Sequence, residues 1–159
     1  MTHDETLTRV REKFPASVLS SNEFRGELTL VIRKSDIVQV CTFLKNECAF
    51  EALRDLCGLD MNTPVDRFFV VYTLYSLTAR CRIRLKVPVD EKELNVPTVT
   101  GVWSTANFHE RETYDMFGII FTDHPDLRRI YMPEEFEYFP LRKDFPLMGI
   151  PDSIPLPKK

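Results

Sequence analysis

The sequence predicts an α+β fold: helices packed on one mostly antiparallel or mixed sheet, followed by a long extended proline-rich C-terminal segment. Residues 27–33 and 80–87 alternate apolar and polar side chains with the period of two that half-buried strands show. Residues 4–13 instead carry apolar side chains at helical spacing. The last 41 residues hold seven of the eleven prolines, which leaves no room for a helix of normal length. We therefore expect a compact α+β domain at 1–118 and an extended segment at 119–159.

The first half of the chain contains a helix, two strands and a second helix in this reading. The helix over about 4–13 is followed by strands at 16–20 and 27–33, with the sequence NEFRG as the turn between them. Ser35 is placed to N-cap the next helix, with Asp36 in its first turn. The apolar stripe of that helix consists of Ile37, Val40, Cys41 and Leu44.

Two further strands and a helix follow. Residues 67–77 are apolar on both faces, which predicts a central strand or one covered on both sides. Residues 80–87 place a row of basic side chains outward, and Pro88 is expected to close the strand. We interpret the row as a solvated face that also protects a sheet edge, with an acidic partner surface as the alternative. A helix over about 104–117 then ends at Gly118, which we expect to be its left-handed C-cap residue. The basic row consists of Arg80, Arg82, Arg84 and Lys86.

Composition excludes several classes of function. A net charge of −3 provides no general field for nucleic acid or an anionic membrane. The longest apolar run, 68–77, is about half the length of a membrane span, and the N-terminal residues lack the pattern of a signal peptide. No two cysteines are spaced as C-x2-C, so we expect reduced core residues in a cytosolic compartment rather than a zinc or iron–sulfur site. The cysteines are Cys41, Cys48, Cys57 and Cys81.

The stretch ANFHERETYDMFG, residues 106–118, has the residue types of an active site without its geometry. A zinc-protease H-E-x-x-H motif would need a second histidine where Thr113 stands, although a site built from His109, Glu112 and His124 is conceivable. Glu110 and Glu112 are two residues apart and point about 200° apart around a helix, so they cannot flank one bond. The sequence also contains no nucleophile elbow and no phosphate-binding loop.

The same helix suggests structural roles for its charges. Arg111 and Asp115 are spaced i,i+4, which suits an ion pair on the helix surface. Glu110 lies on the more apolar side of the helix, where a carboxylate has to be paired. We expect it to anchor a backbone amide or a cation of the following segment.

Three blocks in the last third of the chain resemble the C subunit of the proton-pumping NADH:quinone oxidoreductase, which is the 30 kilodalton subunit family of respiratory complex I. The first block, E-R-E-x-x-D-x-x-G, consists of Glu110, Arg111, Glu112, Asp115 and Gly118. The second, H-P-x-L-x-R, consists of His124, Pro125, Leu127 and Arg129, and the third, P-L-R-K-D, of Pro140, Leu141, Arg142, Lys143 and Asp144. Tyr138 and Phe139 depart from the family pattern, in which a glycine and often a histidine precede the third block, and suggest a locally altered packing surface.

The resemblance implies a non-catalytic structural and assembly subunit of the hydrophilic arm, which supports electron transfer from NADH to quinone by holding the quinone-site subunits together. The chain would bind no cofactor, while other subunits carry FMN and iron–sulfur clusters. Its C-terminal segment would lie along the D subunit, the main contact, near the B and I subunits. It would reach the cytoplasmic face of the cell membrane, or the equivalent organelle membrane, only through these partners. Its cations would pair with the acids of the helix or with the D subunit; they are Arg128, Arg129, Arg142 and Lys143.

Other functions remain open at this point. The same motifs occur in the equivalent subunit of related assemblies, namely a membrane-bound hydrogenase and deazaflavin- or ferredoxin-dependent dehydrogenases. A stand-alone hydrolase using Glu110, Glu112 and Asp115 would show activity in the isolated chain and a raised carboxylate pKa in a pocket. A free-standing adaptor that binds partners through its C-terminal segment fits the composition but not the three-block match.

Overall fold

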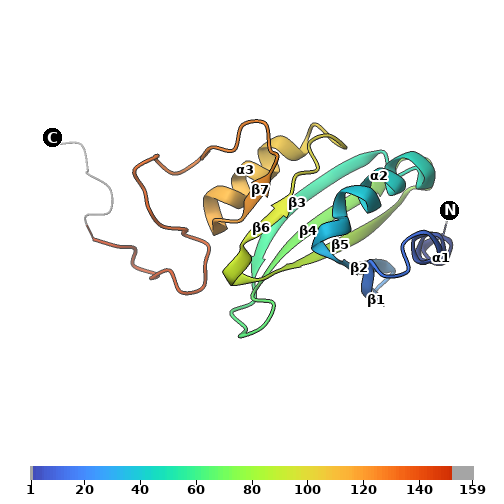
Figure 1. The fold of residues 1–159 in the computed structure, drawn as a ribbon, viewed down its shortest axis with the longest axis horizontal. Coiled ribbons are helices and arrows are strands. Elements are labelled where there is room, and N and C mark those ends of the chain that lie inside the picture. Colours follow the sequence, from blue (N-terminus) through green and yellow to red (C-terminus); the bar gives the residue numbers. More distant parts are fainter. Residues whose placement is uncertain (1, 152–159) are drawn as a thin grey trace.

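The computed structural model describes residues 2–151 and has an α+β fold with a mixed five-stranded sheet, as the sequence predicts (Figure 1). The strand order is β1-β2-β5-β4-β3, and every neighbouring pair is antiparallel except β2 and β5. The strands are β1 (Val18–Phe24), β2 (Glu27–Ile32), β3 (Ala52–Asp60), β4 (Phe68–Ser76) and β5 (Cys81–Val89).

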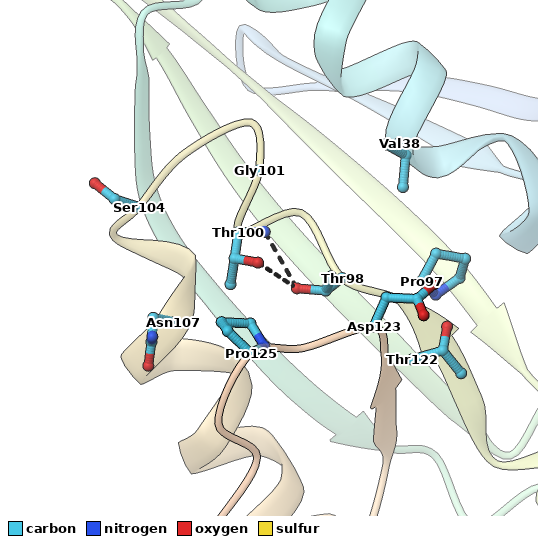
Figure 2. Close-up of a pocket in the computed structure, with 10 residues that line it drawn as sticks. All are labelled: Val38, Pro97, Thr98, Thr100, Gly101, Ser104, Asn107, Thr122, Asp123 and Pro125. Carbon is cyan, nitrogen blue, oxygen red and sulfur yellow. Dashed lines mark hydrogen bonds between the residues drawn. The ribbon is translucent and has the colours of Figure 1, made fainter.

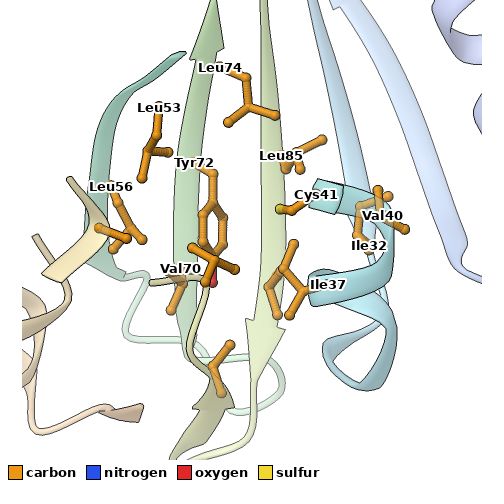
Figure 3. Packing of buried hydrophobic residues seen from close by; sticks show 14 of the residues in the cluster. Ile32, Ile37, Val40, Cys41, Leu53, Leu56, Val70, Tyr72, Leu74 and Leu85 are labelled. Carbon is orange, nitrogen blue, oxygen red and sulfur yellow. The ribbon is translucent and has the colours of Figure 1, made fainter. Parts of the chain in front are cut away.

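Three α-helices pack on one face of this sheet. Their buried side chains and the inward side chains of the strands form a single hydrophobic cluster. Figure 3 shows part of it, with Tyr72 of β4 beside Cys41 and Ile37 of the second helix. The helices are α1 (His3–Lys13), α2 (Ile37–Cys48) and α3 (Ala106–Phe117), and two 3-10 turns, η1 (Lys34–Asp36) and η2 (Glu91–Glu93), lie between elements. No helix within residues 2–151 is both long enough and apolar enough to cross a membrane.

The position of β5 corrects two expectations. The strand lies between β2 and β4, so its basic side chains do not protect an edge. Pro88 does not end it, because the strand runs on to Val89 with Pro88 opposite Phe69 of β4. The pairing of β5 with β2 stops at Lys86, so from there on β5 has only β4 as a hydrogen-bonded neighbour. A strand paired on one side tolerates a residue without an N–H group.

Two further local expectations need correction, and one strand was missed. Ser35 does not cap α2: its hydroxyl donates to the Asp36 carboxylate, 2.8 Å away, and the helix starts after a 3-10 turn. Strand β3 was not predicted, because a shift of register between Leu53 and Asp55 interrupts its alternation. Cys57 is exposed rather than part of the core, although all four cysteines are free.

A second, two-stranded sheet joins the loop before α3 to the residues after it. Strand β6 (Asn95–Pro97) pairs in parallel with β7 (Ile120–Thr122). Ile119 and Phe121 are buried in the hydrophobic cluster. The C-terminal segment therefore starts in close contact with the domain, and its described remainder, 123–151, contains neither helix nor strand.

Candidate functional site

Asp115 of α3 holds the C-terminal segment by its backbone. The side chain is fully buried, and its Oδ2 accepts hydrogen bonds from the amides of Ile130, Tyr131 and Met132 at 3.0, 2.6 and 3.0 Å. Its Oδ1 accepts from Nη1 of Arg129 at 2.8 Å. Burial by itself would raise the pKa of the Asp115 carboxyl, but these hydrogen bonds outweigh it and hold the pKa below its usual value.

Arg129 and Arg111 both bind backbone carbonyl groups of the C-terminal segment. Arg129 also donates to the Tyr138 carbonyl at 3.3 Å, and its guanidinium lies over the ring of Phe139, 5.2 Å from the centroid. Arg111 donates to the carbonyl groups of Arg128 and Arg129 at 3.1 and 3.4 Å. The expected ion pair between Arg111 and Asp115 is therefore wrong. A surface pair at i,i+4 contributes only a few tenths of a kcal/mol, far less than charge-assisted bonds in a buried place.

Gly118 allows the third motif block to pack against the end of α3. Its φ of 76° makes it the left-handed C-cap that the sequence predicts. A Cβ at this position would lie 2.7 Å from Nη2 of Arg142 and 2.7 Å from the Phe139 ring. Arg142 donates to the Phe117 carbonyl at 2.7 Å, and the amide of Leu141 donates to the Met116 carbonyl at 3.2 Å. The residues after Pro140 thus satisfy carbonyls at the C-terminal end of the helix.

A second buried carboxylate, Asp60 at the end of β3, holds the end of the P-L-R-K-D block. Its Oδ2 accepts from the amide of Lys143 at 2.8 Å, and both its oxygens accept from Arg67. Arg67 also contacts the Asp144 carboxylate at 3.1 Å. Burial opposes ionisation of Asp60, but the bonds from Arg67 and Lys143 lower its pKa to about 2. Sequence reasoning missed both Asp60 and Arg67. The one signal in the sequence is that Asp60, an acid, ends an apolar run.

Glu110 anchors a backbone amide as expected, but the amide belongs to the segment before α3, not the one after it. Its Oε1 accepts from the amide of Val99 at 2.8 Å, and its Oε2 accepts from the Thr98 hydroxyl. The His124 side chain is buried with its Nε2 3.9 Å from Oε2. The His124 Nδ1 accepts from the amide of Asp126 at 3.0 Å, which leaves Nε2–H facing the Asn107 carbonyl at 3.3 Å.

An open cavity of about 640 Å³ is lined by Thr98, the residue whose hydroxyl binds Glu110, and Figure 2 shows the residues around it. Thr98 and Thr100 line it from the loop before α3, and their hydroxyl groups are 3.0 Å apart. Asp123 and Pro125 line it from the segment after β7. Neither Glu110 nor any other carboxylate of the first motif block lines this cavity, so it does not present them to a substrate.

The remaining motif residues are dispersed. Glu112 and Lys143 are exposed, and Arg128 pairs with Asp126 at the surface. The Nδ1 of His109 lies 3.8 Å from the Asp55 carboxylate, so the conceivable cluster of His109, Glu112 and His124 does not form. Within residues 2–151 no three His, Cys, Asp or Glu side chains are placed to hold a metal ion.

Glu110 gives this region a pH dependence that can be measured. Burial raises the pKa of the carboxyl from 4.5 to about 7, although the bonds from Thr98 and Val99 lower it. The folded state therefore holds this proton more tightly than the unfolded chain does. The contribution to stability is fully present below pH 4.5, declines as the pH rises, and is lost above pH 7, a difference of about 3 kcal/mol.

The unfolding free energy of the wild type should fall between pH 5 and pH 8 as Glu110 ionises. We expect this fall to be about 2 kcal/mol smaller in Glu110→Gln. The amide stays neutral and still accepts from Val99, and the Thr98 hydroxyl can rotate to accept from it. Urea unfolding at several pH values measures the effect. Glu112→Gln, an exposed change on the same helix, is the control and should leave the pH dependence of the wild type intact. An unchanged slope in Glu110→Gln would contradict the assignment.

The fold and these contacts define an α+β domain in which Glu110 and Asp115 bind the chain's own backbone, and Asp115 fixes the start of a C-terminal segment. The family described as "Respiratory-chain NADH dehydrogenase, 30 Kd subunit" matches residues 30–151. The C subunit of the NADH-quinone oxidoreductase of Geotalea uraniireducens (strain Rf4) is 49% identical over 153 residues, which cover 96% of this chain and 93% of that protein. The protein of the same name from Roseiflexus sp. (strain RS-1) is 54% identical over 143 residues, covering 89% and 82%.

Solved structures agree with this similarity. A chain described as "Nqo5 of the trypsin-resistant fragment (1-134)" matches with a TM-score of 0.65 and 38% identity, covering 77% of this chain and 99% of that one. A chain of the membrane-bound sulfane sulfur reductase, an archaeal respiratory membrane complex, has a TM-score of 0.74 at 22% identity, covering 91% and 86%, and shows the likeness of the fold alone. The chain belongs to the 30 Kd subunit family of the respiratory-chain NADH dehydrogenase.

Proposed function

We propose that this chain is a non-catalytic structural subunit of the peripheral arm of a proton-pumping NADH:quinone oxidoreductase, in which it holds the quinone-site subunits together. The D subunit is its main contact, and the B and I subunits are its further partners. The chain carries no flavin, iron–sulfur cluster or quinone-reacting group, which are bound by other subunits. It sits at the cytoplasmic face of the membrane, or the equivalent organelle face, through these partners.

The observation that carries this proposal is the exposure of apolar side chains on a segment that the domain holds in place. Leu147 and Met148 are 102% and 94% exposed, although the same segment is bound to the domain at the Lys143 amide, through Asp60. Large apolar side chains presented in this way favour a permanent interface with another protein. Further exposed apolar side chains of the segment are Ile120, Ile130, Tyr131, Tyr138 and Leu141.

The arrangement of the motif acids argues against the hydrolase alternative. Both oxygens of Glu110 and both of Asp115 already accept hydrogen bonds from the chain itself. A carboxylate in that state is not free to activate a water molecule or attack a substrate. The relatives at 49% and 54% identity also favour the NADH:quinone oxidoreductase over the related hydrogenase and dehydrogenase assemblies.

Affinity capture of the tagged full-length chain from gently solubilised native membranes tests the proposal, with partners identified by mass spectrometry. We expect the B, D and I subunits with the wild type, and at least about a tenfold lower recovery with Leu147→Asp/Met148→Asp, because two charges would have to be buried at the interface. The unfolding midpoint of the free chain should not change, since these side chains are almost fully exposed in it.

Phe24→Asp/Val65→Asp is the matched control. These side chains are 65% and 76% exposed on the domain itself, and the pair should recover the partners like the wild type. Recovery of the wild-type chain alone, from the soluble fraction, would refute the proposal. Equal recovery of the partners with both double variants would show that Leu147 and Met148 do not belong to the interface.

A further inference from the structure

The outward face of the five-stranded sheet, opposite the helices, gathers cations. Outward side chains of β5 are Arg82, Arg84 and Lys86, and Arg80 precedes them in the hairpin between β4 and β5. Arg54 joins them from the irregular position in β3. The chain as a whole has a net charge of −3, so this face has the opposite sign to the rest of the molecule.

Few carboxylates neutralise these cations. Glu27 accepts both Arg82 and Arg84, at 3.3 and 2.9 Å. Glu51 is engaged by the Leu77 amide and Thr78 hydroxyl, and Asp55 lies 3.8 Å from His109. Within the described part of the chain, the remaining three cations form no ion pair. These are Arg54, Arg80 and Lys86.

Aromatic rings support two of these unpaired cations. The Arg54 guanidinium lies 5.5 Å from the centroid of the Tyr75 ring, and Nζ of Lys86 lies 5.1 Å from that of Phe69. Such contacts position a cation without neutralising it. Arg54 and Lys86 therefore keep their capacity to bind an anion.

A depression of about 350 Å³ collects the donors at one end of this face. Its walls come from three strands or their connections, and its lining consists of Arg54, Thr73, Tyr75, Arg80 and Arg82. Guanidinium groups present paired N–H donors that match the two oxygens of a carboxylate. From the depression, a half-buried apolar strip runs along β4 over Val71 and Phe69.

We propose that this face docks an acidic, partly apolar segment of a neighbouring protein, with one carboxylate in the depression and apolar side chains along β4. An extended segment presents a side chain to one face at every second residue, which is also the spacing of the outward side chains of a strand. An anionic membrane would instead favour protruding apolar side chains, whereas Phe69, Val71 and Tyr75 are all half-buried. The face is separate from the exposed end of the C-terminal segment, so it adds a second interface to the proposed function.

Nuclear magnetic resonance on the isotopically labelled full-length chain tests this docking. The probe is a synthetic peptide of alternating glutamate and leucine, compared with the same peptide carrying glutamine for glutamate. We expect saturable shifts of the Arg54 and Arg80 side-chain signals and of the β4 amides with the acidic peptide alone, weakening as salt is added. Arg54→Gln/Arg80→Gln should weaken binding at least about tenfold, because each change removes a cation that lines the depression and forms no ion pair within the described part of the chain.

The control variant Arg33→Gln/Lys92→Gln removes the same charge from exposed positions elsewhere and should bind the acidic peptide like the wild type. Equal weakening in both variants, or no saturable shift, would overturn the proposal. Binding to phosphatidylglycerol vesicles without binding to the peptide would refute a protein segment as the ligand of this face and indicate a lipid surface instead. The assay needs no other subunit, so its failure is distinguishable from loss of the complex in the capture experiment.

Discussion

Replacing Asp115 by asparagine is expected to lower the unfolding free energy by about 3–5 kcal/mol and to release the start of the C-terminal segment. The carboxylate binds three consecutive amides and Arg129, whose side chain is only 11% exposed. An asparagine amide offers one acceptor oxygen, so buried donors are left unpaired, and Arg129 becomes a buried charge without a counterion. Urea unfolding gives the stability, and limited trypsin cleavage after Arg129 reports the release.

Asp126→Asn provides the matched control for this prediction. Asp126 lies on the same segment and pairs with Arg128, but both side chains are more than half exposed, at 53% and 66%. Its replacement should change stability by no more than about 0.5 kcal/mol and leave trypsin cleavage slow. If Asp115→Asn resembled this control, the three amides would not depend on the carboxylate, and the segment would be held by its apolar contacts alone.

Sequence periodicity predicted the elements whose pattern follows regular geometry. The strand at 27–33 and the helix at 4–13 match β2 and α1 closely, because each buries one face of a regular element. Strand β3 escaped prediction, since its register shift places Arg54 and Asp55 next to each other on the exposed side and breaks the alternation. A bulge of this kind depends on the partner strand, so no local pattern announces it.

The candidate site was predictable where the argument was local. Gly118 followed from the end of a helix, and the need of Glu110 for a partner followed from its apolar side. The partners themselves were less accessible, because Thr98 and Val99 come from an irregular loop. For Asp115 the local argument failed. A pair at i,i+4 is always within reach, but consecutive free amides of an irregular segment bind a buried carboxylate more strongly.

Tyr138 and Phe139, which depart from the family pattern, make specific contacts within this irregular segment. The Tyr138 ring packs edge-on against Phe136, with centroids 5.6 Å apart, and its carbonyl binds Arg129. The Phe139 ring lies beneath the guanidinium groups of both Arg129 and Arg142. In this chain Phe139 is therefore an aromatic platform for Arg129 and Arg142, the two arginines that connect the segment to α3.

Gly118→Ala should be nearly as damaging as the replacement of Asp115, for two reasons that add. The left-handed φ of 76° costs a residue with a Cβ about 1 kcal/mol. In addition, the new methyl group would stand 2.7 Å from Arg142 and from the Phe139 ring. Neither neighbour can give way freely, because Arg142 is bonded to the Phe117 carbonyl and lies over the same Phe139 ring. We expect a total loss of about 3 kcal/mol or more in urea unfolding.

Gly26→Ala separates the two causes. Gly26 has nearly the same φ, 74°, but nothing lies within 4 Å of the position that its Cβ would take. It should therefore show only the conformational cost, about 1 kcal/mol. The difference between the two variants measures how tightly Phe139 and Arg142 close over the end of α3. In the proposed assembly this closure positions the following residues, including Leu147 and Met148, for contact with a partner, so Gly118→Ala should also reduce partner capture, whereas Gly26→Ala should not. Equal losses in the two variants would mean that the third motif block does not pack against Gly118.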